Sequence, residues 1–246
     1  MNLHLQNKHI LITGGSKGIG LACASAFLQE GAHVTLVARN SDTLLAAQRE
    51  LSLTAPAGCK IHVVAADLTQ ADAALAALAE AEGLGGPIDV LVNSAGHGPK
   101  GKILEIPDSD WALGIEMYLM NVIRAVRIAA PVMLAGGGGT ILNFSSAAAV
   151  DPIAIFPISS VARAGLSAYA KLFADEFAAR NLRMNNILPG YIDSLPEVES
   201  RRAVVPMGRY GRVEEVNAMV SYLASDLASY LTGQNFLIDG GMARGI

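Results

Sequence analysis

The chain has 246 residues, a length that one α/β domain reaches without a second folding unit. Apolar residues make up 52% of it and charged residues only 16%, so we expect a large core and helix surface buried between subunits. A net charge of −4 argues against a nucleic-acid-binding protein, and the spacing of five histidines and two cysteines argues against zinc and disulfide-rich proteins.

Short apolar runs alternate with longer helical patterns along the whole chain. The expected strands are 9–13, 33–38, 61–65, 90–93, 140–145, 183–188 and 235–238. The expected helices are 19–30, 42–53, 71–82, 110–134, 159–181 and 214–224, with Gly31 ending the first and Asp67 or Thr69 capping the third. Apolar strands separated by helices are typical of a doubly wound parallel sheet. The sequence therefore predicts a single domain over residues 1–246, a Rossmann-type doubly wound parallel sheet of about seven strands.

Two segments bear on location. Residues 1–6 are polar and lead straight into the first strand, which is not the pattern of a signal peptide. The charge-free run 128–150 is long enough to span a membrane, but it contains Pro131, four consecutive glycines at 136–139 and Asn143. We interpret this run as a helix end, a loop and a buried strand, and we expect a soluble cytoplasmic protein with no membrane partner.

A glycine-rich turn, Thr-Gly-Gly-Ser-Lys-Gly-Ile-Gly at 13–20, joins the first strand to the first helix. Backbone N–H groups at a helix N-terminus point at a bound anion, and glycines let the backbone approach it closely. We expect this turn to hold the pyrophosphate of a dinucleotide. The candidate residues are Gly14, Ser16, Lys17, Gly18, Ile19 and Gly20.

The choice of nucleotide is made where the second strand ends. An acidic residue there would bind the ribose hydroxyls and repel a 2′-phosphate. This chain has Ala38-Arg39-Asn40 instead, and Lys17 lies inside the glycine turn. Two cations at these places suit a phosphate, so the sequence favours NADP(H) over NAD(H).

Four more motifs follow: Asn-Ser-Ala-Gly at 93–96, Asn-Phe-Ser-Ser at 143–146, Pro-Gly-Tyr-Ile-Asp-Ser at 189–194 and Asp-Gly-Gly at 239–241. In this order and at these intervals they resemble the short-chain dehydrogenase/reductase family over nearly the whole chain. The resemblance implies adenosine contacts from Asp67, Leu68, Asn93, Ala95 and Gly96, and nicotinamide contacts from Pro189, Gly190, Ile192 and Ser194. The family usually has Thr at the last of these positions.

The catalytic positions depart from the family. There, a strand-end Ser orients the substrate carbonyl, a Tyr thirteen residues later gives it a proton, and a Lys four residues further holds the nicotinamide ribose. Ser146 matches the Ser, and Asn121 matches a helix Asn that supports a proton-relay water. Ser159 and Arg163 stand where the Tyr and Lys are expected. The resemblance thus implies an atypical site of Asn121, Ser146, Ser159 and Arg163.

This change removes the usual proton donor. An alkyl hydroxyl is a much weaker acid than a phenol, and an Arg guanidinium does not give up its proton, although it can still hold ribose hydroxyls. Loss of a general acid commonly costs about 10²- to 10⁴-fold in rate. Substitute donors are His97, Tyr191 or a water molecule.

We therefore expect an NADP(H)-dependent oxidoreductase that acts on a carbonyl or alcohol. Two alternatives remain: a nucleotide-binding pseudoenzyme that serves as sensor or scaffold, and a non-redox enzyme that keeps NADP(H) as a structural ligand. Ile153, Ile155 and Phe156 could form an apolar wall for a small-molecule substrate. The resemblance also implies a homo-oligomer, a tetramer, paired through helices 110–134 and 159–181.

Overall fold

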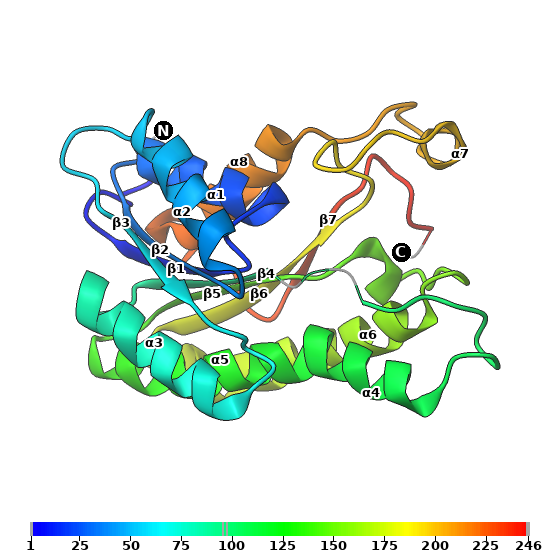
Figure 1. Ribbon diagram of the computed structural model, residues 1–246, viewed down its shortest axis with the longest axis horizontal. Coiled ribbons are helices and arrows are strands. Elements are labelled where there is room, and N and C mark those ends of the chain that lie inside the picture. Colours follow the sequence, from blue (N-terminus) through cyan, green and yellow to red (C-terminus); the bar gives the residue numbers. More distant parts are fainter. Residues whose placement is uncertain (1, 95, 97, 245–246) are drawn as a thin grey trace.

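Seven parallel strands form one sheet in the order β3-β2-β1-β4-β5-β6-β7. The computed structural model describes residues 2–94, 96 and 98–244. The strands are β1 (His9–Thr13), β2 (His33–Ala38), β3 (Ile61–Ala65), β4 (Val90–Ser94), β5 (Gly139–Phe144), β6 (Leu182–Pro189) and β7 (Asn235–Ile238). The chain leaves β3 at one edge and continues with β4 on the other side of β1 (Figure 1). This reversal opens a crevice at the carboxyl ends of β1 and β4, where α/β sheets bind ligands.

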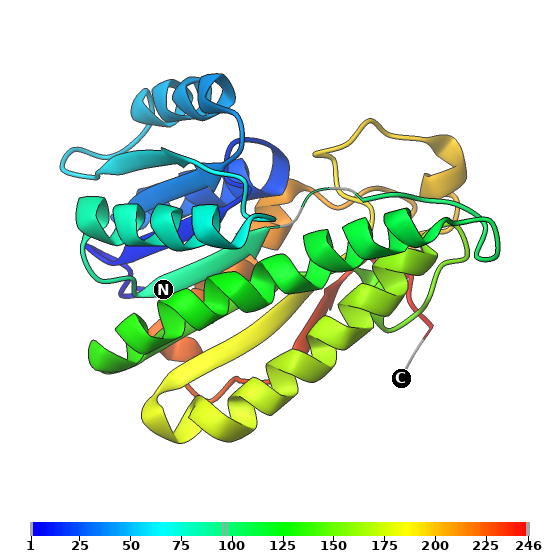
Figure 2. The ribbon, with the colours of Figure 1, turned by 60° about the horizontal axis from the view of Figure 1, so that its bottom comes forward.

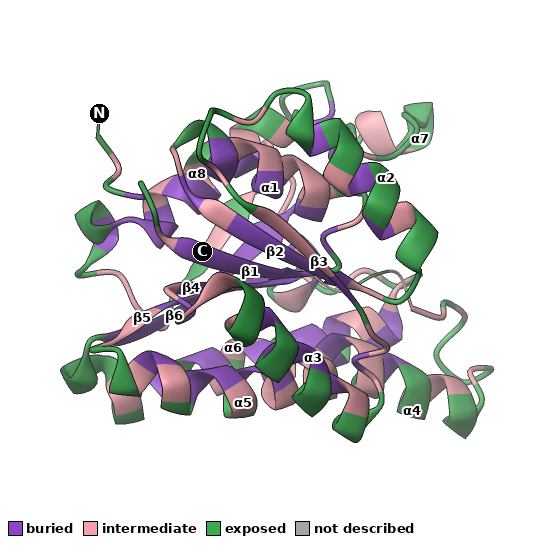
Figure 3. Ribbon diagram, turned by 60° about the vertical axis from the view of Figure 1, so that its left-hand side comes forward, coloured by how far each residue is buried: buried purple, intermediate pink, exposed green. Residues whose placement is uncertain are grey.

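Helices cover both faces of the sheet (Figure 1). The main helices are α1 (Gly18–Gln29), α2 (Ser41–Ser52), α3 (Ala71–Gly85), α4 (Asp108–Ile115), α5 (Asn121–Ala135), α6 (Pro157–Phe177), α7 (Glu199–Arg202) and α8 (Val213–Ala224). Short turns are η1 (Glu116–Met120), η2 (Ala147–Ala149), η3 (Ala178–Arg180) and η4 (Asp226–Ala228). One core lies under α1, α2 and α8, and the other under α3, α5 and α6. Figure 3 shows the buried residues on the helix faces turned toward the sheet.

These elements confirm the predicted fold class, and their boundaries differ from the expected ones by a few residues. α6 begins at Pro157 rather than at 159, because proline is well suited to the first turn of a helix. Gly31 follows the end of α1 with a positive φ of 79°, as expected. The expected cap of α3 is wrong: Gln70 occupies the N-cap position without a side-chain bond, and Asp67 binds Thr69 instead.

The residues of the expected helix 110–134 form one rod. Within this rod the backbone is π-helical rather than α-helical for one turn. α4, η1 and α5 run together from Asp108 to Ala135, beside α6 (Figure 2). Pro131 lies inside α5 and does not end it. Proline has no N–H, so the carbonyl of Arg127 loses its helical hydrogen bond. Arg127 and Pro131 are both exposed, so this carbonyl can bond to water instead. By length and composition alone this rod could cross a membrane; a core helix passes the same test, and one side of this rod packs on the sheet.

Candidate functional site

A cleft of about 560 Å³ lies at the carboxyl ends of the strands, between the glycine turn and the loops after β2, β3 and β4. Eight residues expected at the cofactor or catalytic site line it: Gly14, Ser16, Lys17, Arg39, Asp67, Leu68, Gly96 and Asn121. Sequence reasoning missed several polar lining residues, among them Asn40, Thr43, Thr69 and Ser94. Asn40, Thr69 and Ser94 share one signal, since each lies at or within four residues of the end of a strand, whereas Thr43 lies in the first turn of α2.

The glycine turn forms one wall of the cleft. A Cβ on Gly14, which has a φ of 65°, would lie 2.1 Å from the carbonyl oxygen of Ser94. A Cβ on Gly20 would lie 2.6 Å from the carbonyl oxygen of Gly14. These two glycines therefore allow the turn to pack on itself and on β4, and Gly20 and Ile19 do not line the cleft.

The N-terminus of α1 supplies donors that suit a pyrophosphate. Lys17 is the N-cap residue and makes no side-chain bond to the first turn, so the first N–H groups have no capping partner from that side chain. Gly18 has a φ of 55°, and the only side-chain atom near the place of its missing Cβ is Cβ of Ser194, at 4.0 Å. Exposed cationic side chains of Lys17 and Arg39 add positive charge at this end of the cleft. The chemistry of these donors fits a phosphorylated dinucleotide.

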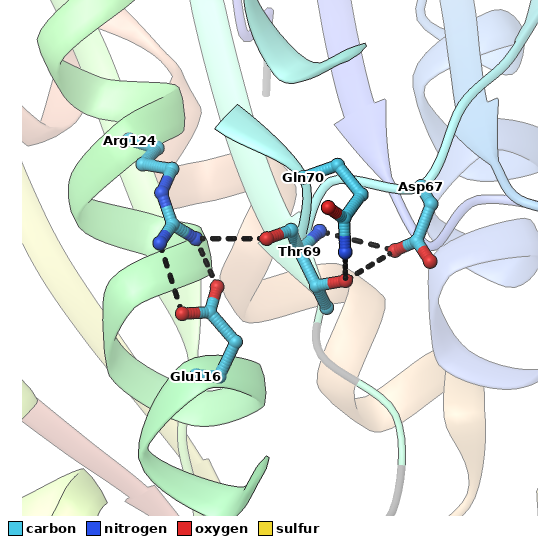
Figure 4. Close-up of polar contacts among 5 residues, drawn as sticks. All are labelled: Asp67, Thr69, Gln70, Glu116 and Arg124. Carbon is cyan, nitrogen blue, oxygen red and sulfur yellow. Dashed lines mark hydrogen bonds and ion pairs between the residues drawn. The ribbon is translucent and has the colours of Figure 1, made fainter. Parts of the chain in front are cut away.

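A polar network joins the loop after β3 to η1 and α5 (Figure 4). The Asp67 carboxylate accepts bonds from the Thr69 amide at 3.1 Å and from the Thr69 hydroxyl at 2.8 Å. The Thr69 bonds, and to a smaller extent the charge of Arg39, hold the pKa of Asp67 below its ordinary value. Arg124 of α5 pairs with Glu116 of η1 and donates to the Thr69 carbonyl at 3.4 Å. The loop after β3 that lines the cleft is thereby tied to the π turn that precedes Asn121.

Asn93 does not reach the cleft, contrary to the expected adenosine contact. It is 2% exposed and begins a row of asparagines at one register across β4, β5, β6 and β7. Side-chain amides bond Asn93 to Asn143, Asn143 to Asn186, and Asn186 to Asn235, at 2.8–2.9 Å. A row of mutually bonded amides cross-links the carboxyl half of the sheet beneath the site.

The segment expected to receive nicotinamide lies beside the C-terminal strand. Gly190 donates to the carbonyl of Ile238, and its missing Cβ leaves room for Asp239. Pro189 ends β6 and Ile192 is 3% exposed, so both side chains are buried, whereas Ser194 is half-buried beside Gly18. Two other expected site residues, Ala95 and His97, lie outside the described residues.

Ser159 and Arg163 lie one turn apart on α6, and Ser159 is half-buried. Arg163 is 7% exposed, and burial lowers the pKa of its guanidinium to about 10, so it stays a cation at neutral pH. It donates to the carbonyl of Phe144 at 2.7 Å and to Oγ of Ser159 at 3.1 Å. Ser146, two residues after Phe144, is half-buried, and its Oγ accepts a bond from the Ala148 amide at 3.2 Å. The structure therefore brings Ser159 and Arg163 to the end of β5, two residues before Ser146, and position 159 holds no phenol.

Two tyrosines near the site have different surroundings. Tyr191, an expected substitute donor, stacks on Tyr210 with ring centroids 5.6 Å apart, and Arg201 lies over its ring. Tyr118 of η1 was not recognised from the sequence. It is buried, and the guanidinium carbon of Arg163 lies 4.5 Å from its ring centroid.

Comparisons with known proteins agree with this architecture. A family model described as enoyl-(acyl carrier protein) reductase matches residues 14–243. The chain is 33% identical to 2-(S)-hydroxypropyl-CoM dehydrogenase 3 of Xanthobacter autotrophicus, with 98% of this chain and 99% of the relative covered. It is also 33% identical to 3-oxoacyl-(acyl-carrier-protein) reductase of Thermotoga maritima, with 98% and 99% covered. The chain belongs to the short-chain dehydrogenase/reductase family.

Structural similarity to this family extends over the full chain. A crystal structure of L-sorbose reductase from Gluconobacter frateurii, complexed with NADPH and L-sorbose, superposes with a TM-score of 0.92. It is 33% identical to this chain, and all of both chains is covered. The protein is thus a short-chain dehydrogenase/reductase in fold and family, an oxidoreductase type.

Proposed function

We propose that this protein is an NADP(H)-dependent oxidoreductase that interconverts a carbonyl compound and an alcohol. The observation that carries the cofactor choice is the pair of cations, Lys17 and Arg39, at the rim of the cleft. No carboxylate stands at the end of β2, where one would repel a 2′-phosphate. The NADPH in the L-sorbose reductase structure is consistent with this choice.

Different residues would bind different groups of the cofactor and the substrate. We assign the pyrophosphate to the N-terminus of α1 with Ser16, and the 2′-phosphate to Arg39 with Lys17. Bound NADPH would supply the hydride. Ser146, at the end of β5, would orient the substrate carbonyl through its hydroxyl. Asn121 would hold a relay water where α5 begins. Arg163 donates hydrogen bonds to the Phe144 carbonyl and to Oγ of Ser159, and it supplies positive charge near them.

The substrate would enter between the loop after β4 and the start of α6. Lys100 belongs to the loop after β4, and Phe156 directly precedes α6. Nζ of Lys100 lies 5.1 Å from the ring centroid of Phe156. Ile155, beside that ring, is 56% exposed. Ile155 and Phe156 would contact an apolar part of the substrate, and Lys100 would contact a polar end. These residues favour a small, largely apolar substrate with a polar end.

A fluorescence titration tests the nucleotide choice. We expect NADPH to bind at least about tenfold more tightly than NADH, because each phosphate contact to a charged donor contributes about 1.5–3 kcal/mol. The measurement is the enhancement of reduced-nicotinamide fluorescence, with NADH as the matched control. Equal affinities would contradict the NADP(H) assignment, and no binding of either nucleotide would overturn the oxidoreductase proposal.

One observation favours a second function, that of a nucleotide-binding sensor or scaffold: position 159 holds no phenol. In that case NADPH would bind, but its absorbance at 340 nm would not fall with any carbonyl compound. A non-redox reaction would instead form product without a change in nicotinamide absorbance. These readouts separate the three functions.

We also propose that the outer faces of α5 and α6 pair with a second copy, as the first step toward a tetramer. Leu134, Leu172 and Phe173 line an apolar groove of about 750 Å³ between these helices, and Leu172 is 67% exposed. Leu172→Glu is expected to shift the protein toward monomer in sedimentation equilibrium, because it would bury a charge in the interface. The control is Leu53→Glu, at a residue 86% exposed just after α2. A Leu172→Glu protein with unchanged mass would refute this interface.

A further inference from the structure

Tyr118 lies against the altered pair on α6. Its side chain is 5% exposed, and Cζ of Arg163 lies 4.5 Å from the centroid of its ring. The same guanidinium donates to Oγ of Ser159 at 3.1 Å and to the carbonyl of Phe144 at 2.7 Å. One cation therefore contacts the phenol of Tyr118, the hydroxyl of residue 159 and the end of β5. Ser146, to which we assign the substrate carbonyl, follows Phe144 by two residues.

The backbone around Tyr118 also belongs to the site. Met117, the residue before it, and Asn121, three residues after it, line the nucleotide cleft, while Tyr118 itself faces Arg163. All of them lie in or directly after the π-helical turn η1, and such turns are frequent at functional sites. The ion pair of Glu116 with Arg124 holds this turn (Figure 4). The phenol is thus on a fixed element between the cleft and α6.

The hydrogen bonding leaves the phenol proton available. The amide of Gly98 bonds to Oη of Tyr118, and a backbone N–H can only donate. Oη is therefore the acceptor in this bond, and its own proton remains for an acceptor supplied by substrate or water. Gly98 makes this contact possible, since a Cβ there would lie 2.9 Å from Oη. The loop after β4, which lines the cleft at Gly96, thereby holds the hydroxyl by its backbone.

The charge of Arg163 suits a donor. Arg163 keeps its positive charge at neutral pH in a buried setting, where Coulomb interactions are stronger than in water. A phenol that gives up its proton becomes negative, and a cation over its ring stabilises that charge. The paired change on α6 thus removes one phenol and places a permanent cation beside another.

We infer that Tyr118 is the proton donor of this enzyme, a phenol placed on η1 in place of the missing phenol on α6. This inference rests on the proposed oxidoreductase function. In the reductive direction, hydride from NADPH forms a C–H bond at the carbonyl carbon, and the C=O π pair moves to oxygen. The O–H bond of Tyr118 breaks, its proton forms the alcohol, and the phenolate regains a proton from solvent. The carbonyl is reduced and NADPH is oxidised to NADP⁺.

Tyr118→Phe is the direct test, because it keeps the ring under Arg163 and removes only the hydroxyl. With NADPH and 2,3-butanedione or 9,10-phenanthrenequinone as probes, kcat is expected to fall about 10²- to 10⁴-fold, as for loss of a general acid. The Kd for NADPH is expected to stay close to wild type, and the melting temperature is expected to fall by only a few degrees, because one part-buried hydrogen bond is lost. The ¹⁵N and ¹H shifts of the Gly98 amide are expected to move, because this amide loses its acceptor. Tyr230→Phe is the matched control, since Tyr230 is fully exposed.

A second variant distinguishes proton donation from packing. Ser159→Tyr in the Tyr118→Phe background returns a phenol to α6 and is expected to recover at least about tenfold of the lost kcat. Wild-type kcat in Tyr118→Phe would overturn the donor role while leaving the oxidoreductase function intact. Wild-type protein that binds NADPH but reduces neither probe, while Ser159→Tyr with Arg163→Lys does, would overturn both the donor role and native redox activity. Loss of kcat with an equal loss of NADPH affinity and no rescue would show a structural role only.

Discussion

Arg39→Asp is expected to weaken NADPH binding by about 100-fold, or about 3 kcal/mol, while NADH binding stays level or improves. The substitution removes a guanidinium from the rim of the cleft and puts a carboxylate where the 2′-phosphate would lie. The same carboxylate could accept a bond from the 2′-hydroxyl of NADH. Fluorescence titration of both nucleotides measures the change in selectivity.

The control for Arg39→Asp is Arg49→Asp, which makes the same change of charge on the same side of the fold. Arg49 is exposed in the last turn of α2, about 12 Å along the helix axis from the start of that helix, and does not line the cleft. We expect its effect on NADPH affinity to be small and to disappear in salt. If both variants lose the same affinity, the effect comes from net charge and Arg39 is not the phosphate ligand.

Gly14→Ala is expected to lower the free energy of unfolding by about 2–4 kcal/mol and to abolish nucleotide binding. Its Cβ would lie 2.1 Å from the carbonyl oxygen of Ser94, which is backbone and cannot rotate away. The φ of 65° adds strain for any residue with a Cβ. Urea unfolding followed by circular dichroism measures the stability, and the NADPH titration measures the binding.

Gly83→Ala is the matched control for this substitution. Gly83 lies inside α3, and no atom lies within 4 Å of the place where its Cβ would be. Alanine there is expected to raise the free energy of unfolding by up to about 1 kcal/mol, because it favours the helical backbone. A Gly14→Ala protein as stable as wild type would mean that the turn can move away from β4, and the packing role of Gly14 would be wrong.

Local patterns in the sequence predicted the sheet and its helices well. β1, β2, β3 and β7 have the expected bounds, because apolar runs of strand length between turns identify buried parallel strands. The interruption at Glu116–Met120 could not be predicted, since a π turn differs from α-helix in one hydrogen-bond register and leaves the apolar pattern intact. The cap of α3 was wrong for a similar reason: Asp67 and Thr69 bond to each other, and the sequence does not say which bond forms.

Some features of the candidate site could be predicted from the sequence, and others could not. The glycine turn, the cations Lys17 and Arg39, and the absence of Tyr at 159 and Lys at 163 are properties of the sequence by itself. Only the tertiary structure decided that Asn93 is committed to the amide row under the site, and that Arg163 turns inward to Phe144. It alone placed Tyr118 against Arg163, forty-five positions later in the chain. Motifs of residues close in sequence can be recognised from residue type and spacing. Contacts between distant elements depend on how the helices and the sheet pack together.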